Sequence, residues 1–429
     1  MQAINIYAEM TIEELYKIFC AHPVVTTDSR DCPQGSIFFA LKGENFNGNL
    51  YAAAALEKGC SYAVVDEPVS TDKRVVLVDD VLTTLQKLAN YHRRQLGTRI
   101  VGVTGTNGKT TTKELISSVL SEKYNVLYTQ GNFNNHIGVP KTLLRLTKEH
   151  DIAVVEMGAN HPGEIKTLVN IVEPDYGIIT NVGKAHLEGF GSFEGVIKTK
   201  GELYDYLREH HGKVFINENN EHLMKISSGL DLIPYGKEGS IIACDPYLRF
   251  SYDNGSQTYA VNTHLIGSYN IDNMMAAACM GNYFGVEAES IVHALSNYIP
   301  SNNRSQLEVT ADNKLIIDAY NANPTSMMAA LTNFSKMEVE PKMAILGDMR
   351  ELGEISQEEH QKIVDFLTEN HLDNVWLVGE EFMKTDCGYR KFHNVDEVKE
   401  VITASKPKGF YILIKGSNGT KLFQLPELL

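Results

Sequence analysis

The sequence predicts an α/β protein of three domains: a small amino-terminal α/β domain, a central domain built on a parallel sheet, and a carboxy-terminal Rossmann-like α/β domain. Short β-branched strands followed by a turn and an amphipathic helix recur along almost the whole chain. Several apolar strands run directly into Gly, Asn, Asp, Glu, Lys or His. The 429 residues also exceed what one hydrophobic core usually supports, so two or three domains are expected.

Two boundaries divide the chain into three expected domains, residues 1–85, 86–300 and 301–429. In the first domain, residues 35–41 and 61–67 are predicted strands and residues 51–59 a predicted helix. A helical connector at 81–97 leads into the long middle region. A Pro and polar cluster at 299–306 marks the second boundary, after which the strand–helix alternation restarts.

Six predicted strands share one pattern, an apolar run that ends in polar residues. They lie at residues 99–105, 152–160, 176–186, 314–324, 342–352 and 410–419. In open parallel α/β sheets, ligands bind beyond the carboxyl ends of the strands. We therefore expect two sites, or two halves of one site, at these strand ends.

Composition and charge restrict the class of protein. Lys and Arg total 39 against 54 Asp and Glu, a net charge of −15, which disfavours a nonspecific nucleic-acid binder. The six Cys lie far apart and form no C-x-x-C, so reduced thiols in a cytoplasmic protein are expected. The amino terminus has no basic stretch before an apolar one, so no signal peptide is predicted. No apolar run approaches the roughly 20 residues that span a bilayer, so no membrane span is expected.

The segment TGTNGKTTTKEL is the strongest functional signal, because it follows a β-branched strand and opens a predicted helix. Gly105 and Gly108 let the backbone curl so that N–H groups face phosphate oxygens, and the helix N-terminus adds its dipole. Lys109 supplies a charge for the β- and γ-phosphates, and the Thr110 hydroxyl is a Mg²⁺ ligand. The strict phosphate-loop pattern has Gly where this chain has Val103. The alternative, a Gly-rich turn with a solvated Lys, rarely has this spacing, so we predict that the chain binds a nucleoside triphosphate.

Two residues near strand ends are candidate Mg²⁺ ligands. Glu156 ends an apolar strand, where a carboxylate is costly to bury without a cation. The alternative for Glu156 is a capped or salt-bridged strand end. His186 follows the next strand after a short loop, and its alternative is a structural role, because His is an unusual ligand for so hard a cation.

Further positions have both a binding and a structural interpretation. Lys200 by itself has the character of a solvated helix cation. Asp318 ends a strand and could accept a hydrogen bond from a ribose hydroxyl, and Arg304 could place its guanidinium on a γ-phosphate when domains close. Lys415 and Ser417 repeat the strand–Gly–helix pattern and offer a second anion site. Taken by itself, each of these residues could equally have a purely structural role.

Together these segments resemble the Mur ligases, the ATP-dependent amino-acid ligases of peptidoglycan precursor synthesis. The resemblance spans essentially the whole chain, in the family's order, through TGTNGKTTT, the Glu156 strand, NVGKAHLEGFGS, KTKGEL, NNRSQ, DAYNANPTSM and KGS. Within the family, GNFNNHIGVPKTLL, EMGANHPGEI and ILGDMRELGE are similar to the member that adds D-alanyl-D-alanine to the UDP-N-acetylmuramoyl tripeptide. Residues 28–51 resemble its UDP-sugar-binding amino-terminal domain. The resemblance thus implies a ligase that uses ATP and Mg²⁺ and has a central phosphate-loop ATPase domain; a monomer is expected, although the sequence itself does not determine the oligomeric state.

The resemblance also implies roles for individual residues. Contacts to ATP are implied for Gly105, Thr106, Asn107, Gly108, Lys109, Thr110, Thr111, Asn270, Asn273, Arg304 and Asp318. Two Mg²⁺ ions are implied, with the ligands Thr110, Glu156, His186 and Lys200. Lys200 would serve as a carbamate formed with CO₂, which turns a cation into an anion. The implied catalytic residues are Lys109, Glu156, His186 and Lys200, and the implied substrate-binding residues are Ser29, Arg30, Asn135, His136, Lys415 and Ser417. Tyr269 stands where the family often has His.

The implied reaction is phosphorylation of the tripeptide's terminal carboxylate by ATP, followed by attack of the dipeptide amine on the acyl phosphate. Because water must be excluded, the carboxy-terminal domain is expected to close over the nucleotide, with residues 302–306 as the hinge. Alternatives are a related ligase for another amino acid, a folylpolyglutamate synthetase, a phosphate-loop switch or scaffold, and a simple kinase. The related tripeptide-forming ligase would have an Asp-Asn-Pro-Arg type of segment late in the chain, and none occurs. The third residue of the peptide, meso-diaminopimelate or lysine, is left open.

Overall fold

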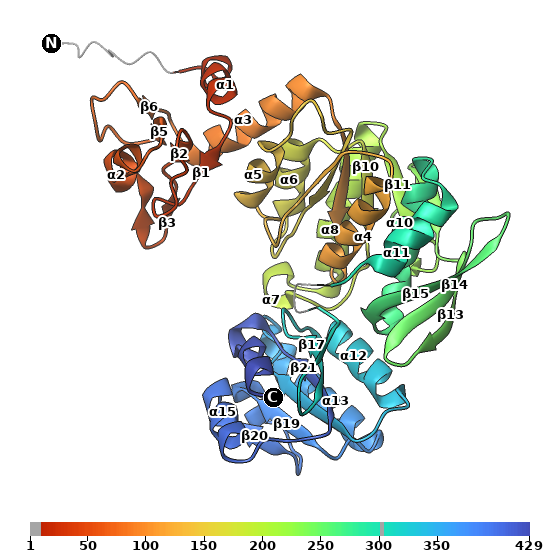
Figure 1. Cartoon of the computed structure of the whole chain (residues 1–429). Coiled ribbons are helices and arrows are strands. Elements are labelled where there is room, and N and C mark those ends of the chain that lie inside the picture. The colour runs from red at the N-terminus through yellow and green to blue at the C-terminus, as the bar shows by residue number, and fades with distance from the viewer. Residues whose placement is uncertain (1–9, 301–303) are drawn as a thin grey trace. The chain divides into compact units, whose positions relative to one another are not determined.

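The computed structural model describes residues 10–300 and 304–429 (Figure 1). The expected hinge at 302–306 and the amino terminus inspected for a signal peptide therefore lie partly outside the described residues. The chain forms two compact units. One comprises the described residues up to Gly102 together with Tyr124–Gly158 and Glu164–Tyr176. The other comprises Val103–Lys123, Ala159–Gly163 and the described residues from Gly177 to Leu429.

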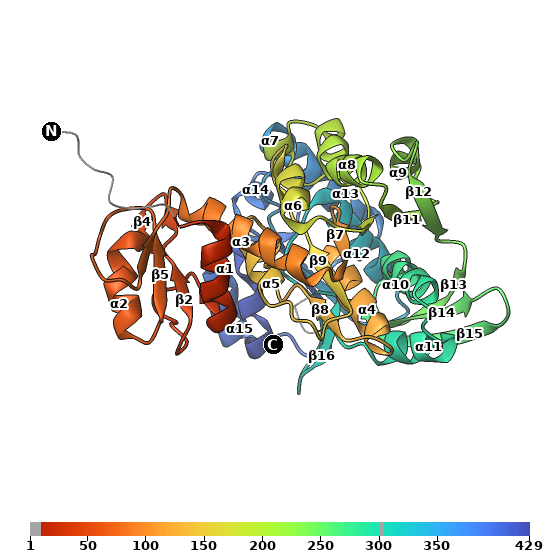
Figure 2. The same cartoon turned by 90° about the horizontal axis from the view of Figure 1, so that it is seen from above.

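The amino-terminal part contains a four-stranded parallel sheet with the order β1-β2-β5-β6. Its strands are β1 (Val25–Thr26), β2 (Ile37–Phe39), β5 (Tyr62–Val65) and β6 (Val75–Leu77), and a small hairpin is formed by β3 (Lys42–Gly43) and β4 (Phe46–Asn47). The helices are α1 (Ile12–Ala21), α2 (Ala52–Glu57) and α3 (Val81–Leu96). Helix α2 packs beside β5, as Figure 2 shows, and buries Ala55 against Phe38 and Val65. The predicted strands and helix of this region are confirmed.

The central sheet has six strands in the order β12-β11-β10-β7-β9-β8. Its strands are β7 (Arg99–Thr104), β8 (Val126–Tyr128), β9 (Ile152–Glu156), β10 (Tyr176–Ile179), β11 (Lys213–Asn217) and β12 (Asp231–Tyr235). The accompanying helices are α4 (Lys109–Ser121), α5 (Gly138–Leu143), α6 (Glu164–Val172), α7 (Leu187–Phe190), α8 (Phe193–Glu209), α9 (Glu221–Lys225), α10 (Ile271–Tyr283) and α11 (Ala288–Asn297). Strand β9 is buried on both faces, as parallel strands between helices are.

Residues 239–266 depart from the expected strand–helix alternation. They form an antiparallel three-stranded sheet, β13 (Gly239–Cys244), β14 (Tyr247–Asp253) and β15 (Thr258–Ile266). Buried and more exposed residues alternate along β14 and most of β15, and Asn254-Gly255 lies in the turn between them. An Asn-Gly pair between two strands of alternating burial is a sequence signal for a β-hairpin, and it explains why β14 and β15 pair in an antiparallel direction.

The carboxy-terminal sheet has the order β16-β17-β21-β18-β19-β20, parallel except for β16. Its strands are β16 (Gln306–Val309), β17 (Lys314–Asp318), β18 (Lys342–Gly347), β19 (Val375–Val378), β20 (Arg390–Phe392) and β21 (Tyr411–Lys415). The helices are α12 (Pro324–Lys336), α13 (Ser356–Glu369), α14 (Glu380–Met383) and α15 (Val395–Ala404). Successive strand residues point to opposite faces, so Ile316 packs with α12 and α13 while Ile317 packs with α15. The order places the carboxyl ends of β17, β21 and β18 side by side.

None of the helices in the described part of the chain combines the length and the apolar composition that a bilayer crossing requires.

Candidate active site

The phosphate loop lies between β7 and α4, where the sequence predicts it. Gly105 and Gly108 both have positive φ, +143° and +76°, and α4 begins at Lys109. The Lys109 ammonium folds back and donates to the carbonyl oxygens of Gly105 at 2.8 Å and Thr106 at 3.0 Å. The loop therefore has the curled backbone and the cation that a phosphate group requires.

The end of β10 holds this loop from one side. Asn181 accepts a hydrogen bond from the Asn107 N–H at 2.9 Å, and its amide donates to the Asn107 carbonyl at 3.0 Å. The Thr180 hydroxyl donates to the same carbonyl at 2.6 Å. A Cβ at Gly105 would lie 2.0 Å from the Thr180 hydroxyl oxygen, so only glycine fits there. Sequence analysis did not single out Thr180 or Asn181 as supports of the loop.

Helix α10 holds the other side of the loop through two predicted adenine contacts. The Thr112 hydroxyl donates to Asn273 Oδ1 at 3.0 Å, Asn273 donates to Asn270 Oδ1 at 2.8 Å, and Asn270 donates to the Ile266 carbonyl at 2.8 Å. A Cβ at Gly108 would lie 2.7 Å from Asn273 Oδ1. Both asparagines are thus brought to the phosphate loop, where they link α4 to α10.

Glu156 is the last residue of β9 and is 1% exposed. Its Oε1 accepts a hydrogen bond from the Asn134 amide at 2.8 Å, and its N–H donates to the Thr129 hydroxyl at 3.0 Å. The carboxylate is therefore fixed in direction at a strand end, as a metal ligand needs to be.

His186 and Lys200 lie in one electrostatic neighbourhood with Lys109. Burial lowers the pKa of His186, opposing the raising effect of Glu351, and the charges of Lys109 and Lys200 lower it further. Lys200 is 2% exposed; its Nζ donates to the Ala159 carbonyl at 3.1 Å and lies 5.2 Å from the centre of the Phe190 ring. The structure therefore excludes the solvated-cation interpretation of Lys200.

In the described residues, no cluster of three or more His, Cys, Asp and Glu side chains is arranged to hold a metal ion. The candidate donors Thr110, Glu156 and His186 supply a hydroxyl, a carboxylate and an imidazole. The hydroxyl and carboxylate oxygens fit Mg²⁺, which takes few protein ligands and completes its shell with water and phosphate oxygens, whereas the imidazole is an uncommon ligand for this ion.

The carboxy-terminal strand ends bring together two residues that sequence analysis treated separately. Asp318 and Lys415 are register partners on β17 and β21, and the Lys415 ammonium donates to Asp318 Oδ2 at 2.5 Å. Lys415 is 1% exposed and also donates to the Asn321 carbonyl at 3.3 Å. The Ser417 hydroxyl donates to the Ala322 carbonyl at 3.3 Å.

Arg304 and Ser305 each contact a tyrosine side chain. The Arg304 guanidinium stacks 3.9 Å from the centre of the Tyr320 ring, and its buried Nε has no hydrogen-bond partner among the described residues. The Tyr269 hydroxyl is 2.9 Å from the Ser305 hydroxyl. Burial raises the pKa of Tyr269 far above its usual range, so this side chain remains neutral.

Four of the predicted substrate-binding residues lie in the compact unit that contains the amino-terminal sheet, and each contacts residues of that same unit. Arg30 is exposed and pairs with Asp28 at 2.8 Å, and the Ser29 carbonyl accepts from Lys58 Nζ at 2.7 Å. Asn135 Oδ1 accepts from the Gly138 N–H at 2.9 Å at the start of α5. His136 is exposed, and its carbonyl accepts from Gln86 at 3.0 Å.

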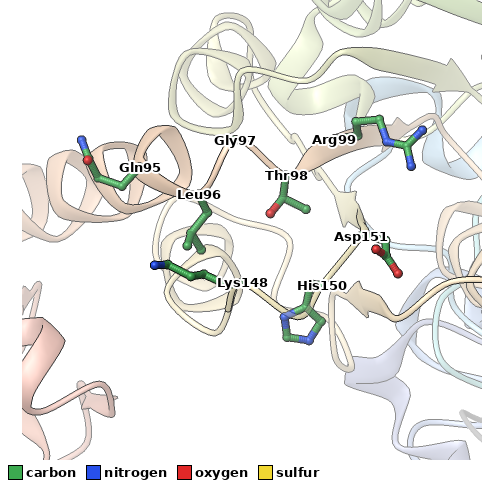
Figure 3. Close-up of a pocket in the computed structure, with 8 residues that line it drawn as sticks. All are labelled: Gln95, Leu96, Gly97, Thr98, Arg99, Lys148, His150 and Asp151. Atoms are coloured by element: carbon green, nitrogen blue, oxygen red, sulfur yellow. The ribbon is translucent and has the colours of Figure 1, made fainter.

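A pocket of about 320 Å³ lies at the amino end of β7 (Figure 3). Arg99 begins β7, and Asp151 immediately precedes β9. Because parallel sheets bind ligands at the carboxyl ends of their strands, this pocket is not the candidate nucleotide site.

Three family profiles match the chain: the Mur ligase family catalytic domain at residues 23–96, the Mur ligase middle domain at 103–281, and the Mur ligase glutamate ligase domain at 303–418. The UDP-N-acetylmuramoyl-tripeptide–D-alanyl-D-alanine ligase of Bacillus subtilis (strain 168) is 36% identical over 422 residues, 94% of this chain and 92% of that protein. The chain belongs to the Mur ligase family.

Solved structures agree with this membership. The crystal structure of MurF from Acinetobacter baumannii has a TM-score of 0.87 and 30% identity, covering 97% of this chain and 98% of that chain. The structure of MurF ligase from Thermotoga maritima in complex with ADP has a TM-score of 0.83 and 26% identity, covering 95% and 97%. The predicted family and the three-domain α/β fold class are confirmed.

Proposed function

We propose that this Mur ligase adds D-alanyl-D-alanine to UDP-N-acetylmuramoyl-tripeptide and forms the UDP-pentapeptide, with ATP converted to ADP and phosphate. The observation that carries the proposal is the shared neighbourhood of Lys109, His186 and the buried Lys200 at a phosphate loop. A nucleotide switch needs the loop but has no need of a buried lysine and a histidine beside it. The 36% identity to the Bacillus subtilis ligase of this name supports the choice of substrates.

Nucleotide binding rests on the loop and the elements that hold it. The N–H groups of residues 108–111 at the start of α4 and the Lys109 ammonium bind the β- and γ-phosphates. Lys109 exchanges its two carbonyl partners for phosphate oxygens. We assign Asn270 and Asn273 to the adenine, Asp318 to the ribose and Arg304 to the γ-phosphate.

Thr110, Glu156 and His186 are the protein ligands of two Mg²⁺ ions, joined by Lys200 as a carbamate. Lys200 is buried beside the Phe190 ring, and the carbamate forms when its neutral amine adds CO₂ and releases a proton. Bound Mg²⁺ offsets the negative charge that builds on the transferring phosphoryl group. The residues of the chain orient the ATP and keep water away from the acyl phosphate.

The reaction proceeds in two displacements. An oxygen of the tripeptide carboxylate attacks the γ-phosphorus, and the bond to ADP breaks. The neutral amine of D-alanyl-D-alanine then attacks the acyl carbon. The tetrahedral intermediate expels phosphate, which keeps the former carboxylate oxygen, and the amine proton passes to solvent. Positioning and charge stabilisation account for most of the acceleration.

The remaining assignments follow from the domains. We assign the domains to residues 1–85, 86–300 and 301–429; the profile matches at 23–96, 103–281 and 303–418 support three domains, although the first match extends beyond residue 85. Ser29, Arg30, Asn135 and His136 belong to the UDP-tripeptide side, and Lys415 and Ser417 to the dipeptide carboxylate. The enzyme acts as a monomer in the cytoplasm, where ATP and UDP-sugars are supplied.

Mass spectrometry of the products tests the function. The enzyme is incubated with ATP, Mg²⁺, D-alanyl-D-alanine and a UDP-muramoyl tripeptide ending in meso-diaminopimelate or in lysine. We expect a new amide with one of the two, and phosphate release only when both substrates are present. Carboxylate labelled with ¹⁸O must deliver one labelled oxygen to phosphate. Phosphate release without an amide product would contradict the proposal.

A further inference from the structure

The imidazole of His186 contacts the carboxylate of Glu351, a residue to which the proposed function gives no role. Nδ1 of His186 meets Oε2 of Glu351, which lies in the loop after β18. The main chains meet as well, because the Glu188 N–H donates to the Glu351 carbonyl at 3.3 Å. His186 and Glu351 both have left-handed backbones, with φ of +51° and +61°. Non-glycine residues hold this conformation only where surrounding contacts fix them.

This contact determines which ring nitrogen is available. A carboxylate at Nδ1 keeps the proton on that nitrogen, so Nε2 presents its lone pair. Histidines that bind metal ions commonly donate their other N–H to a carboxylate, which fixes the tautomer and the ring orientation. Glu351 thus occupies the position that such an orienting group requires.

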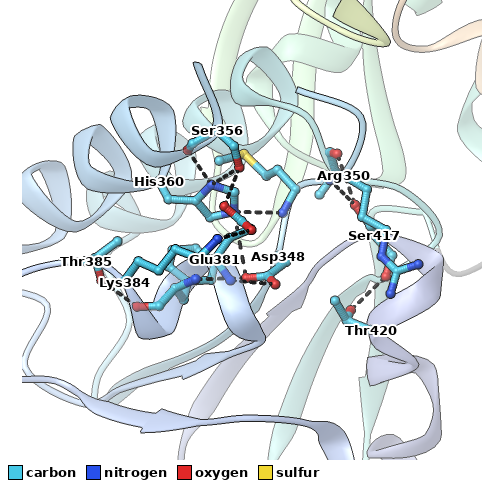
Figure 4. A network of polar contacts seen from close by, with 12 residues as sticks. Asp348, Arg350, Ser356, His360, Glu381, Lys384, Thr385, Ser417 and Thr420 are labelled. Carbon is cyan, nitrogen blue, oxygen red and sulfur yellow. Dashed lines mark hydrogen bonds and ion pairs between the residues drawn. The ribbon is translucent and has the colours of Figure 1, made fainter. Parts of the chain in front are cut away.

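The residues that precede Glu351 in the loop are held by a network of polar contacts, shown in Figure 4. The Asp348 carboxylate, at the start of the loop, accepts hydrogen bonds from the N–H groups of Glu381 and Phe382, each at 3.0 Å. A Cβ at Gly379 would lie 2.2 Å from the Asp348 carboxyl carbon, so this close approach requires glycine. His360, which is fully buried, lies beside this carboxylate.

The next two residues of the loop are fixed through their N–H groups. The Met349 N–H donates to His360 Nε2 at 3.0 Å, and His360 Nδ1 donates to the Ser356 carbonyl at 2.7 Å. The Arg350 N–H donates to the Ser417 hydroxyl at 3.0 Å. Residues 348–350 are therefore anchored one after another, and Glu351 follows directly.

The loop that carries His186 makes further contacts with the same region. The Lys184 N–H donates to the Thr325 hydroxyl at 3.2 Å, and the Lys184 ammonium pairs with Glu359 at 3.1 Å. Glu351 differs from these two residues because it touches the imidazole itself.

We propose that Glu351 is a positioning residue that orients His186 for the metal ion. Binding of the ion then depends on whether the loop after β18 holds Glu351 against the imidazole. The inference rests on the proposed role of His186 as a Mg²⁺ ligand. Asp348 and His360 affect His186 only indirectly, because they hold the loop that carries Glu351 and do not touch the imidazole of His186.

Manganese binding tests the inference without turnover. Electron paramagnetic resonance measures the Kd of Mn²⁺ for the full chain with a non-hydrolysable ATP analogue. We expect Glu351→Ala to raise this Kd about 10-fold, with Glu351→Gln between Ala and wild type. The control Glu354→Gln removes the same charge three residues later, at an exposed position, and should leave the Kd unchanged.

A double-mutant cycle separates positioning from general damage. In a His186→Ala background, adding Glu351→Ala should change the Mn²⁺ Kd by less than about 2-fold, because the orienting group has lost its partner. An unchanged Kd for Glu351→Ala, or an equal loss in the His186→Ala background, would overturn the inference. If Glu351→Ala does not fold, Glu351→Gln decides in the same way. A wild-type enzyme that forms no UDP-pentapeptide would contradict the proposed function. That result is obtained separately from the Mn²⁺ titration, so the two failures can be distinguished.

Discussion

The phosphate loop and the carboxyl ends of the carboxy-terminal sheet are both strand-end sites, but they are built from different groups. The phosphate loop relies on backbone geometry, with two left-handed glycines and polar contacts that mostly involve its own main chain. The carboxy-terminal strand ends rely on charged side chains, chiefly the Asp318–Lys415 pair and the buried Asp348.

This difference predicts where each site is sensitive. Adding a methyl group should damage the phosphate loop, where the Cβ of Gly105 has no room. Removing a charge should damage the carboxy-terminal strand ends, where Lys415 is buried against Asp318. Helix α8 offers a third case, because its Lys200 combines a buried position with a proposed role that depends on charge.

The largest effect is expected for Lys200→Ala. Losing one preorganised charge at the transferring phosphoryl group should lower kcat for UDP-pentapeptide formation about 10³-fold. Nucleotide affinity should change little, because the loop contacts remain. Short carboxylic acids should restore part of the activity by replacing the proposed carbamate. The control Lys198→Ala removes an exposed lysine of the same helix. Full activity of Lys200→Ala would remove the carbamate from the mechanism.

Gly105→Ala should show the backbone dependence of the phosphate loop. The new Cβ would lie 2.0 Å from the Thr180 hydroxyl, and the residue would keep a φ of +143°. We expect ATP affinity to fall about 100-fold, equivalent to about 2.7 kcal/mol. Gly97→Ala is the matched control, because Gly97 has a φ of +66° with open space around it. Equal ATP affinities in the two variants, measured by calorimetry, would show that the close packing against Thr180 is unimportant.

The same difference explains how much the sequence could predict. The phosphate loop is a contiguous motif whose glycines and lysine have fixed spacing, so its position and the start of α4 followed from the sequence. Its supports, Thr180 and Asn181, directly follow a neighbouring strand and carry no pattern of their own. They became visible only when β10 lay beside β7.

The carboxy-terminal site shows the limit more clearly. Asp318 and Lys415 were both named from the sequence, but as separate contacts to ribose and to substrate. Their pairing depends on the adjacency of β17 and β21, which are 97 residues apart at this register. Glu351 lies in a motif that carried the family resemblance, yet its contact with His186 depends on a folded loop. Charge pairs between distant strands need the topology before they can be predicted.

Asp318→Asn should show the charge dependence of the carboxy-terminal strand ends. The change leaves the Lys415 ammonium buried without its carboxylate, and we expect a loss of about 2 kcal/mol in unfolding free energy. Trp376, the only tryptophan of the chain, lies in β19 and reports this sheet by fluorescence in urea. Adding Lys415→Met should recover part of the loss. Asp396→Asn breaks an exposed pair with Lys399 and serves as the control. Similar losses in both single variants would contradict the role of burial.

The smallest expected effect is a pH dependence confined to the carboxy-terminal sheet. Burial lowers the pKa of His360, and the charge of Lys384 acts in the same direction, while the hydrogen bond to Ser356 and the carboxylates of Asp348 and Glu381 oppose it. The folded state therefore binds a proton less readily than the unfolded state, whose histidine titrates near pH 6.5. The contribution of His360 to the free energy of unfolding is therefore fully present above that pH. It falls as the pH drops below that value, by at most about 1.4 kcal/mol per pH unit.

Urea transitions of Trp376 between pH 7.5 and 5.5 measure this slope. His360→Gln should flatten it, since Gln does not titrate. His393 provides a control of opposite sign, because the Glu380 carboxylate raises its pKa and its pairing strengthens as the pH falls. His393→Gln should therefore steepen the decline slightly. An unchanged slope in His360→Gln would mean that the proton responsible binds elsewhere. The contacts of His360 with Asp348 and Met349 would then not depend on pH in this range. The carboxy-terminal strand ends would still differ from the phosphate loop in their charge pairs, but they would have no pH dependence of their own.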